Sequence, residues 1–405
     1  MEPRESERSA KATRKLSMLS PFNDLALKGW KSGKKVVLYD TTLRDGEQMP
    51  GVSFSKAQKL RIAQALCDAG VKHIEAGFPA VSKREAAAVK AVAGLRTGAE
   101  TLALCRARKG DVDACVDCGV DIALIFIATS DIHLEHKYKC SRERAVEMAL
   151  GAMEYAGERG LRFTFSTEDS TRSDMGYMLS LNKMAERLGA ERIGITDTVG
   201  CATPESVAHL VGKICAGAKR PVSAHLHNDL GLAVANGLSA VRAGAAALAT
   251  TVNGIGERAG NLPLEEFAVA SELLLGADHG IDLSKLTSVS RLVARAARIE
   301  TPRNKPIVGG NIFAHESGIH VAAVLNEPFT YEPISPELVG GARRFVLGKH
   351  TGIAAIRMML GSKKERLTGA QERKVLARVK SRGEGNGSVT VKEFWRIVRG
   401  AGNGR

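Results

Sequence analysis

The feature that most constrains this chain is a unit that repeats eight times after residue 35. Each unit opens with a short apolar run, continues through polar residues or glycine, and closes with Ala, Leu and Val at helical spacing. The apolar runs span residues 36–39, 73–76, 101–105, 122–128, 162–165, 192–195, 222–224 and 247–252. Strands that alternate with helices pair in parallel, because a parallel pair needs a crossover connection. The pattern predicts an α/β fold, a closed (β/α)8 TIM barrel; a doubly wound open sheet is the alternative.

The helices expected between these strands span residues 56–69, 83–92, 142–158, 180–188, 204–216 and 233–243. The repeat ends near residue 275. Residues 284–300, 349–360 and 368–380 again have helical spacing, whereas 301–350 is rich in proline and glycine and 383–387 reads as a flexible break. We therefore predict a basic N-terminal tail (1–35), a TIM-barrel domain (36–283), and a C-terminal region with a linker, small helical subdomains and a basic tail (284–405).

The net charge of +14 resides mostly in the two ends of the chain. Residues 1–35 hold 9 Lys/Arg against 4 Asp/Glu, and residues 361–405 hold 12 against 4, so the body between them is close to neutral. Aromatic residues are few and form no stripe with the basic ones. This distribution argues against nucleic-acid binding and favours solvated tails.

Neither a membrane nor an oxidising compartment is indicated. No apolar run reaches the roughly 18 residues that a membrane-spanning helix needs. The N-terminal residues lack the apolar core of a signal peptide, and Glu2, Glu5 and Glu7 argue against a transit peptide. The 7 scattered cysteines fit reduced thiols better than a disulfide framework. We expect a cytoplasmic protein without membrane contacts.

Polar side chains gather where the predicted strands end, which is where the loops of a TIM barrel form an active site. The first strand runs into Asp40-Thr-Thr-Leu-Arg-Asp-Gly-Glu-Gln48, which can hold a metal ion and an anionic substrate together. Polar candidates near the ends of the other strands are Glu75, Arg106, Arg108, Ser166, Glu168, Thr198, His225, His227 and Asn261.

His225-x-His227 is the sharpest signal among them. Residues i and i+2 of a strand point to the same face, so both imidazoles are expected to enter the mouth of the barrel. Two histidines and one carboxylate, with other positions open, are a usual ligand set for a catalytic divalent ion. We predict that Asp45 supplies the carboxylate. A hydrogen-bonded histidine pair without metal is the alternative.

Two further motifs have competing interpretations. Gly254-x-Gly256, with Gly260, follows the last strand instead of opening a βαβ unit, so a tight turn beside the site is favoured over a dinucleotide loop. Cys115-x-x-Cys118 lies in a helical pattern without a second cysteine pair, which favours buried thiols over a zinc site.

His315-Glu-Ser-Gly-Ile-His320 lies outside the predicted barrel. One interpretation is that these side chains cap and pack the irregular region. The other is that this region reaches over a barrel mouth and supplies an acid/base group, because histidine titrates near neutrality.

Four motifs together resemble the homocitrate synthase and 2-isopropylmalate synthase family. They are residues 40–48, His225-x-His-Asn-Asp229, Gly254-x-Gly-Glu-Arg-Ala-Gly-Asn261 and His315–His320, and the resemblance covers about residues 36–360. It implies a TIM barrel that holds a divalent metal (Mg, Mn or Zn) and condenses acetyl-CoA with a 2-oxo acid. Hydrolysis of the resulting thioester then releases CoA.

The resemblance also implies a role for each candidate. The metal ligands would be Asp45, His225 and His227, with Asn261 close by. Arg44 would hold the 2-oxo acid and add positive charge where the alkoxide develops. Glu168 and His320 are candidate bases for the methyl proton of acetyl-CoA. The pocket would be lined by Gln48, Glu75, Ser166 and Thr198. His320 and Tyr331 would come from the partner subunit of a homodimer.

Within the family, the sequence looks most like the homocitrate synthases of nitrogen-fixing bacteria, which use 2-oxoglutarate. Isopropylmalate synthases of this family usually carry a longer regulatory domain, for which residues 361–405 leave no room. Lysine-pathway homocitrate synthases typically have Arg where Thr164 stands and Glu where Ser223 stands. We predict that Arg106 or Arg108 supplies the missing positive charge for the distal carboxylate.

Other functions compete with this interpretation. A 2-isopropylmalate or citramalate synthase would use a branched or short 2-oxo acid. An aldolase or lyase of the same barrel superfamily would cleave a carbon–carbon bond without acetyl-CoA, but it would not need the cover that His320 and Tyr331 imply. A binding protein without activity would leave the converging acids and histidines without a purpose.

Overall fold

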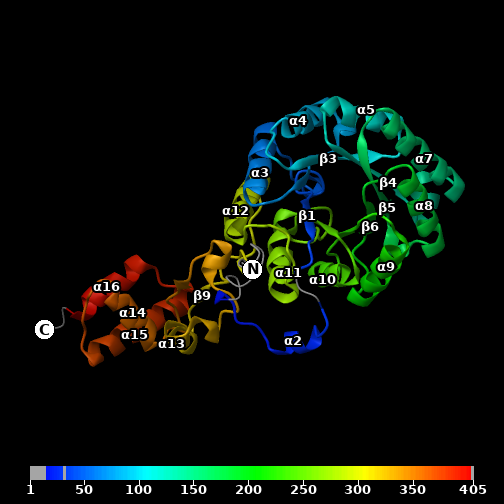
Figure 1. Ribbon diagram of the computed structural model, residues 1–405. Helices are drawn as coiled ribbons and strands as arrows, with labels where there is room; N and C mark the ends of the chain where they lie inside the picture. Colours follow the sequence, from blue (N-terminus) through cyan, green and yellow to red (C-terminus); the bar gives the residue numbers. More distant parts are fainter. Residues whose placement is uncertain (1–14, 31–32, 403–405) are drawn as a thin grey trace, which may run out of the picture. The chain divides into compact units, whose positions relative to one another are not determined.

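A closed barrel of parallel strands forms the larger part of the computed structural model, which describes residues 15–30 and 33–402. The strands follow one another around the barrel in chain order, and β8 pairs with β1 (Figure 1). They are β1 (Val37–Asp40), β2 (His73–Glu75), β3 (Glu100–Arg106), β4 (Ile122–Ala128), β5 (Arg162–Glu168), β6 (Ile193–Asp197), β7 (Val222–Leu226) and β8 (Ala247–Thr250). The predicted TIM barrel is confirmed, and the doubly wound sheet is excluded. Residues 1–14 and 31–32 of the predicted N-terminal tail lie outside the described residues.

Helices alternate with the strands and surround the barrel (Figure 1). They are α3 (Lys56–Asp68), α4 (Lys83–Ala93), α5 (Lys109–Cys118), α7 (Arg142–Glu158), α8 (Met175–Arg187), α9 (Pro204–Gly217), α10 (Ala233–Ala243) and α11 (Leu264–Leu275). Local sequence sets their starts: Ser55 and Gln58 form a capping box on α3, and Thr203 caps α9. The helix predicted at 180–188 begins earlier, because Asp174 caps α8.

The inner face of the barrel determines which side chains reach its mouth. Tyr39, Leu104, Leu124, Ala247 and Ala249 form the inner cluster, and Phe126 packs against it. Paired residues of neighbouring strands share a face, so Ser166, which pairs with Phe126, also faces inward. Glu168 lies two residues further along β5 and therefore points into the mouth.

The described residues fall into two compact units. The first is Leu25–Glu300, and the second comprises the residues from Thr301 onward with an N-terminal segment that ends at Asp24. The first unit extends past the predicted boundary at 283, because α12 (Leu286–Ala297) packs on the barrel. Gln58 Nε2 donates to Ala296 O at 3.2 Å, and Asn253 Nδ2 donates to Ser290 O at 3.0 Å.

The second unit has a helical core of its own. Its helices are α13 (Gly318–Asn326), α14 (Ile353–Gly361), α15 (Gly369–Asn386) and α16 (Val391–Gly402). The break predicted at 383–387 is wrong, because α15 continues through Gly383. A Cβ atom on Gly383 would lie 2.4 Å from the backbone nitrogen of Lys349, so this glycine permits close packing and does not end the helix. Among residues 15–30 and 33–402, no helix has the length and apolar character to cross a membrane.

Candidate active site

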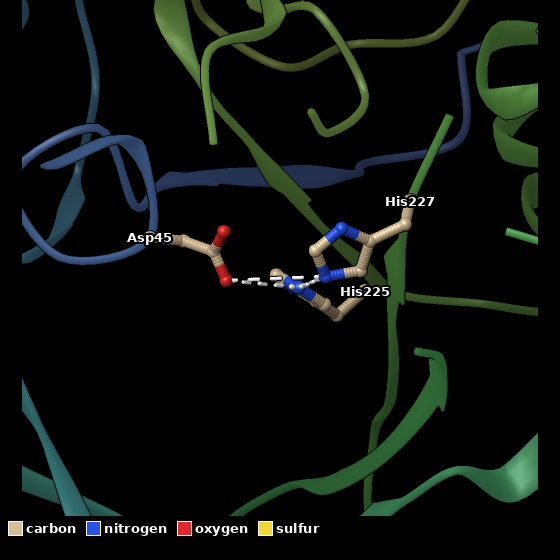
Figure 2. A group of neighbouring side chains, drawn as sticks. All are labelled: Asp45, His225 and His227. Carbon is tan, nitrogen blue, oxygen red and sulfur yellow. Dashed lines mark hydrogen bonds and ion pairs between the residues drawn. The ribbon is translucent and has the colours of Figure 1, made fainter. Parts of the chain in front are cut away.

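Asp45, His225 and His227 converge at the mouth of the barrel (Figure 2). Asp45 follows β1, His225 lies in β7 and His227 follows it. His225 Nε2 is 3.5 Å from Asp45 Oδ2 and 3.2 Å from His227 Nε2, and His227 Nε2 is 4.0 Å from Asp45 Oδ2. Within the described part of the chain, no other three His, Cys, Asp or Glu side chains come this close together.

The protonation of this triad suits a divalent cation. Although burial opposes it, Arg44 and the two histidines hold the pKa of Asp45 well below its usual range. Burial, followed by the neighbouring His225, lowers the pKa of His227 to about 3. A carboxylate and a neutral imidazole are the forms that bind metals. Asn261 Oδ1 is a buried acceptor that meets no hydrogen-bond donor among the described residues, which also fits a nearby cation. The donor set therefore fits the metal that the sequence predicts.

A glycine-rich turn brings Asn261 to the triad. Asn261 Nδ2 donates to Asp45 Oδ1 at 2.8 Å and to Ile255 O at 3.2 Å. Gly256 has φ +155, and a Cβ atom there would lie 2.1 Å from Asn261 Nδ2 and 2.9 Å from Asp45 Oδ1. Only glycine fits this close approach. The turn holds the amide against Asp45, in agreement with the interpretation of this motif as a turn beside the site.

Arg44 is fixed beside the triad by three acceptors. Its Nε and Nη2 donate to the two carboxylate oxygens of Glu75 at 2.7 and 3.1 Å, and its Nη1 donates to Asp45 Oδ2 at 2.5 Å. A longer bond of 3.4 Å joins Nη1 to Gln48 Oε1. Although burial opposes it, Glu75 and Asp45 raise the pKa of Arg44. The guanidinium is therefore a fixed positive charge at the mouth.

A second group of side chains lies at the ends of β5 and β6. Both carboxylate oxygens of Glu168 accept from Lys137 Nζ, at 2.6 and 2.8 Å. Ser166 is buried behind Glu168 in β5. Thr198 Oγ1 accepts from the backbone N–H of Asp169 at 2.9 Å, so this hydroxyl supports the β5 loop. Sequence reasoning missed Lys137, because it lies on a π-helical turn, η3 (Leu134–Tyr138), well beyond the end of β4.

Arg258 is a second residue that sequence reasoning did not single out. Its Nε and Nη2 donate to Asp229 at 2.8 and 3.0 Å, and Nη2 also donates to Thr198 O at 2.7 Å. It holds a left-handed backbone conformation with φ 56. The guanidinium thus joins the loops that follow β6, β7 and β8. The sequence signal that could have pointed to Arg258 was its place in the Glu-Arg-Ala-Gly-Asn stretch that follows β8.

The two arginines at the end of β3 differ in their partners. Arg106 donates from Nε and Nη2 to Asp111 at 2.8 and 2.9 Å. Arg108 is exposed, and no hydrogen bond or ion pair engages its guanidinium within the described residues. Arg108 is therefore the one of the two that is available to a ligand.

His320 and Tyr331 belong to the second compact unit and lie together there. Their rings stack with centroids 3.9 Å apart, and both side chains are exposed. His315 is instead buried, with Nε2 2.8 Å from Glu332 Oε1, and Arg343 also donates to that carboxylate. His315 is thus a packing residue, and His320 is the histidine of this motif that is free for chemistry.

The cysteine pair that the sequence singled out lies in a helix of the barrel unit. Cys115 and Cys118 are free, buried thiols in α5, as expected.

A cleft of about 340 Å³ opens beside Arg44 and Gln48 in the barrel unit. Its lining includes the rings of Phe54 and Phe78 and the basic side chains of Lys56 and Arg84.

Comparisons with known proteins agree with this geometry. Residues 35–293 match the HMGL-like family, and residues 307–386 match the homocitrate synthase post-HMGL domain-like family. The chain is 44% identical to homocitrate synthase AksA of Methanothermobacter thermautotrophicus, over 94% of this chain and 97% of that protein. It is 52% identical to a probable 2-isopropylmalate synthase of Ignicoccus hospitalis, over 79% of this chain and 80% of that protein.

Solved structures show the same fold. The HMG-CoA lyase of Bacillus subtilis superposes with a TM-score of 0.61 at 19% identity, over 67% of this chain and 97% of that chain. The barrel is therefore shared with that lyase, whereas the sequence identity lies with the synthases. The chain belongs to the HMGL-like family and, within it, to the homocitrate synthase and 2-isopropylmalate synthase family of enzymes.

Proposed function

We propose that this enzyme condenses acetyl-CoA with 2-oxoglutarate to give homocitrate and CoA, with a divalent metal held by Asp45, His225 and His227. The observation that carries the proposal is the position of Arg44, whose Nη1 lies 2.5 Å from Asp45 Oδ2 in the triad. A 2-oxo acid needs a cation for its carboxylate and its ketone oxygen, and a positive charge close by for the alkoxide that forms.

The metal, when bound, would act as a Lewis acid toward the ketone of the 2-oxo acid. Arg44 adds its fixed charge to the same oxygen, and Glu75 keeps the guanidinium plane in place from behind. Because Glu75 and Asp45 already orient Arg44, it needs little reorganisation when charge develops on the substrate. Asn261 holds Asp45 in its ligand orientation through a bond of 2.8 Å.

The other substrate must lose a proton before it attacks. Glu168 or His320 takes the proton from the methyl group of acetyl-CoA, and the resulting carbanion attacks the ketone carbon. Water then cleaves the thioester, and CoA leaves as the thiol. The cleft beside Arg44 suits acetyl-CoA, because Phe54 and Phe78 offer apolar surface and Lys56 and Arg84 offer positive charge for phosphates.

The distal carboxylate of 2-oxoglutarate needs a cation that the metal site does not provide. We assign this role to Arg108, which is exposed just after β3 and whose guanidinium has no partner among the described residues. The Arg108→Ala variant is expected to raise the KM for 2-oxoglutarate about tenfold, the loss of one charge-assisted bond. An unchanged KM would remove Arg108 from the site.

A 2-isopropylmalate or citramalate synthase is the alternative, supported by the identity to the Ignicoccus hospitalis protein. The test is to follow release of the CoA thiol from acetyl-CoA with purified protein, a divalent ion and a panel of 2-oxo acids. We expect release with 2-oxoglutarate. Release with 2-oxoisovalerate or pyruvate alone would move the assignment to the alternative. No release with any acid would overturn the synthase function itself.

Three broader predictions accompany this function. We propose that the enzyme is a homodimer and that its homocitrate serves the nitrogenase cofactor, as the sequence resemblance implies, and that it lies in the cytoplasm, as the sequence composition indicates. Sedimentation would test the dimer, and cell fractionation the location. A deletion strain that still grows on N2 without added homocitrate would contradict the nitrogenase role.

A further inference from the structure

The ion pair between Lys137 and Glu168 occupies a carboxylate that the proposed reaction needs. Lys137 Nζ lies 2.6 and 2.8 Å from the two carboxylate oxygens of Glu168. His133 also faces Glu168, with Nδ1 3.9 Å from Oε2. Both carboxylate oxygens of Glu168 already accept from the ammonium, so the pair has to open before this carboxylate can approach a C–H group of a substrate.

The segment that carries Lys137 has an unusual backbone. It comprises α6 (Asp131–His133) and the π-helical turn η3, and it ends at Lys139, a non-glycine residue with φ 53. Such turns and strained residues concentrate at functional sites. Burial, with the charge of Glu168, raises the pKa of Tyr138 to about 12, so the neighbour of Lys137 stays neutral. Within this segment, Lys137 is the residue whose ammonium group reaches Glu168.

This charge lies across the barrel from the metal triad. The triad comes from the ends of β1 and β7, with Asn261 after β8, whereas Arg108, Lys137 and Glu168 come from β3, the loop after β4, and β5. In the closed strand order, β3 to β5 lie opposite β7 to β1. A 2-oxo acid held at the triad by its carboxylate and ketone directs its tail toward this opposite side.

We propose that Lys137 recognises the distal carboxylate of a dicarboxylic 2-oxo acid and leaves Glu168 when it does so. This inference rests on the proposed condensation and names a specificity residue beside Arg108. The exchange replaces one carboxylate by another on the same ammonium. Its cost is small, because the Lys137 side chain is 48% exposed and water screens an ion pair at such a position. Binding of the correct substrate thereby frees the base.

The test compares two acids of the same carbon chain, 2-oxoglutarate and 2-oxopentanoate, which lacks only the distal carboxylate. In Lys137→Met the apolar stem remains and the charge is gone. We expect kcat/KM for 2-oxoglutarate to fall by about tenfold to 100-fold through KM, while kcat/KM for 2-oxopentanoate stays the same or rises. Lys137→Arg should recover most of the preference. Arg142→Met is the matched control, since Arg142 pairs with Asp131 of the same segment.

Each other result overturns a defined part of this inference. An equal loss with both acids in Lys137→Met would show that Lys137 only positions Glu168. An unchanged ratio, or a wild-type enzyme that prefers 2-oxopentanoate, would also exclude recognition of the tail but leave the synthase function intact. Absence of CoA release from the wild type with every acid would instead overturn the proposed function. Circular dichroism spectra of both Lys137 variants establish that they are folded.

Discussion

His227 shows how burial can keep a histidine ready to bind a metal. Its pKa of about 3, lowered by burial and by His225, means that the ring is neutral at physiological pH, which is the form that binds a cation. Asp45 is ionised at neutral pH because Arg44 and the histidines stabilise its carboxylate. Asp45 and His227 are therefore in the forms that bind a metal at neutral pH.

Removal of one imidazole tests this arrangement. The His225→Ala variant is expected to bind Mn²⁺ or Zn²⁺ at least 100-fold more weakly, since even the loss of an outer partner typically costs about 10–100-fold. A calorimetric titration of the metal-free protein measures this, and turnover should be lost in parallel. His209→Ala, an exposed histidine on α9, is the control. Full activity of the His225 variant would refute the ligand assignment.

The residues of the site differed in how far the sequence could predict their place. Asp45, His225 and His227 lie within a few residues of strand ends, so strand periodicity and barrel topology bring them together. Lys137 could not be placed this way, because a π-helical turn and a left-handed residue direct it back to Glu168. Neither feature has a pattern in the sequence around it.

At the level of elements, a buried network links the end of β1 to the turn after β8. Asp40 accepts from the N–H and the hydroxyl of Thr42 at 2.8 and 3.0 Å, and the same hydroxyl accepts from the N–H of Val252 at 2.8 Å. Asp40 is fully buried, and burial raises its pKa to about 7. The network positions Arg44 and Asp45 against the turn that carries Asn261.

Asp40 gives the stability of the barrel a predictable pH dependence. Its pKa is higher in the folded than in the unfolded chain, so its contribution to stability is fully present below about pH 4 and is lost as the pH rises through about 7. Between pH 5 and 8, the free energy of unfolding of the wild type should therefore fall relative to Asp40→Asn, by on the order of 2–4 kcal/mol. Urea unfolding at a series of pH values measures the difference.

The control for this comparison is Asp117→Asn, an exposed position on α5. Its unfolding free energy should follow the wild type at every pH. Parallel curves for the wild type and Asp40→Asn would contradict the role of Asp40, because they would mean that its carboxyl titrates alike in the folded and unfolded chains.

Buried charges between elements were the part of the fold that periodicity could not predict. Lys59 of α3 is fully buried, with Nζ 2.6 Å from Glu47 and 2.6 Å from Glu85. The sequence offers no apparent partner for Glu47, which follows the first strand. The partner is a lysine on the next helix, and a lysine in a helical pattern is normally expected at the surface.

At the scale of the whole chain, the eightfold repeat predicted the barrel because each strand–helix repeat must bury its strand on both faces. The second compact unit of the chain contains no such repeat, and short helices such as α13 and α16 depend on tertiary contacts for their stability. Val321 meets Phe394 and Trp395 in one core there, although it is distant from them in the sequence. The sequence predicted some of these helices but not how they assemble.

The division into two units leads to the last prediction. His320 and Tyr331 belong to the second unit, whereas Arg44, Glu168 and the metal triad belong to the barrel unit. If His320 acts on the barrel of a partner subunit, as the family resemblance implies, two inactive variants should complement each other. A mixed dimer of His225→Ala and His320→Ala would contain one complete site. An equal mixture should recover about a quarter of wild-type activity after subunits exchange.

Native mass spectrometry establishes that mixed dimers have formed, and each variant alone provides the baseline. A mixture that contains mixed dimers but no more activity than the variants alone would show that His320 serves the barrel of its own chain or takes no part in the reaction. The activity of His320→Ala alone separates these cases, since it is retained only if His320 takes no part. A Tyr331→Phe variant tests the hydroxyl of the neighbouring tyrosine, because its ring can still stack on His320. Normal activity in that variant would limit the role of Tyr331 to holding the imidazole.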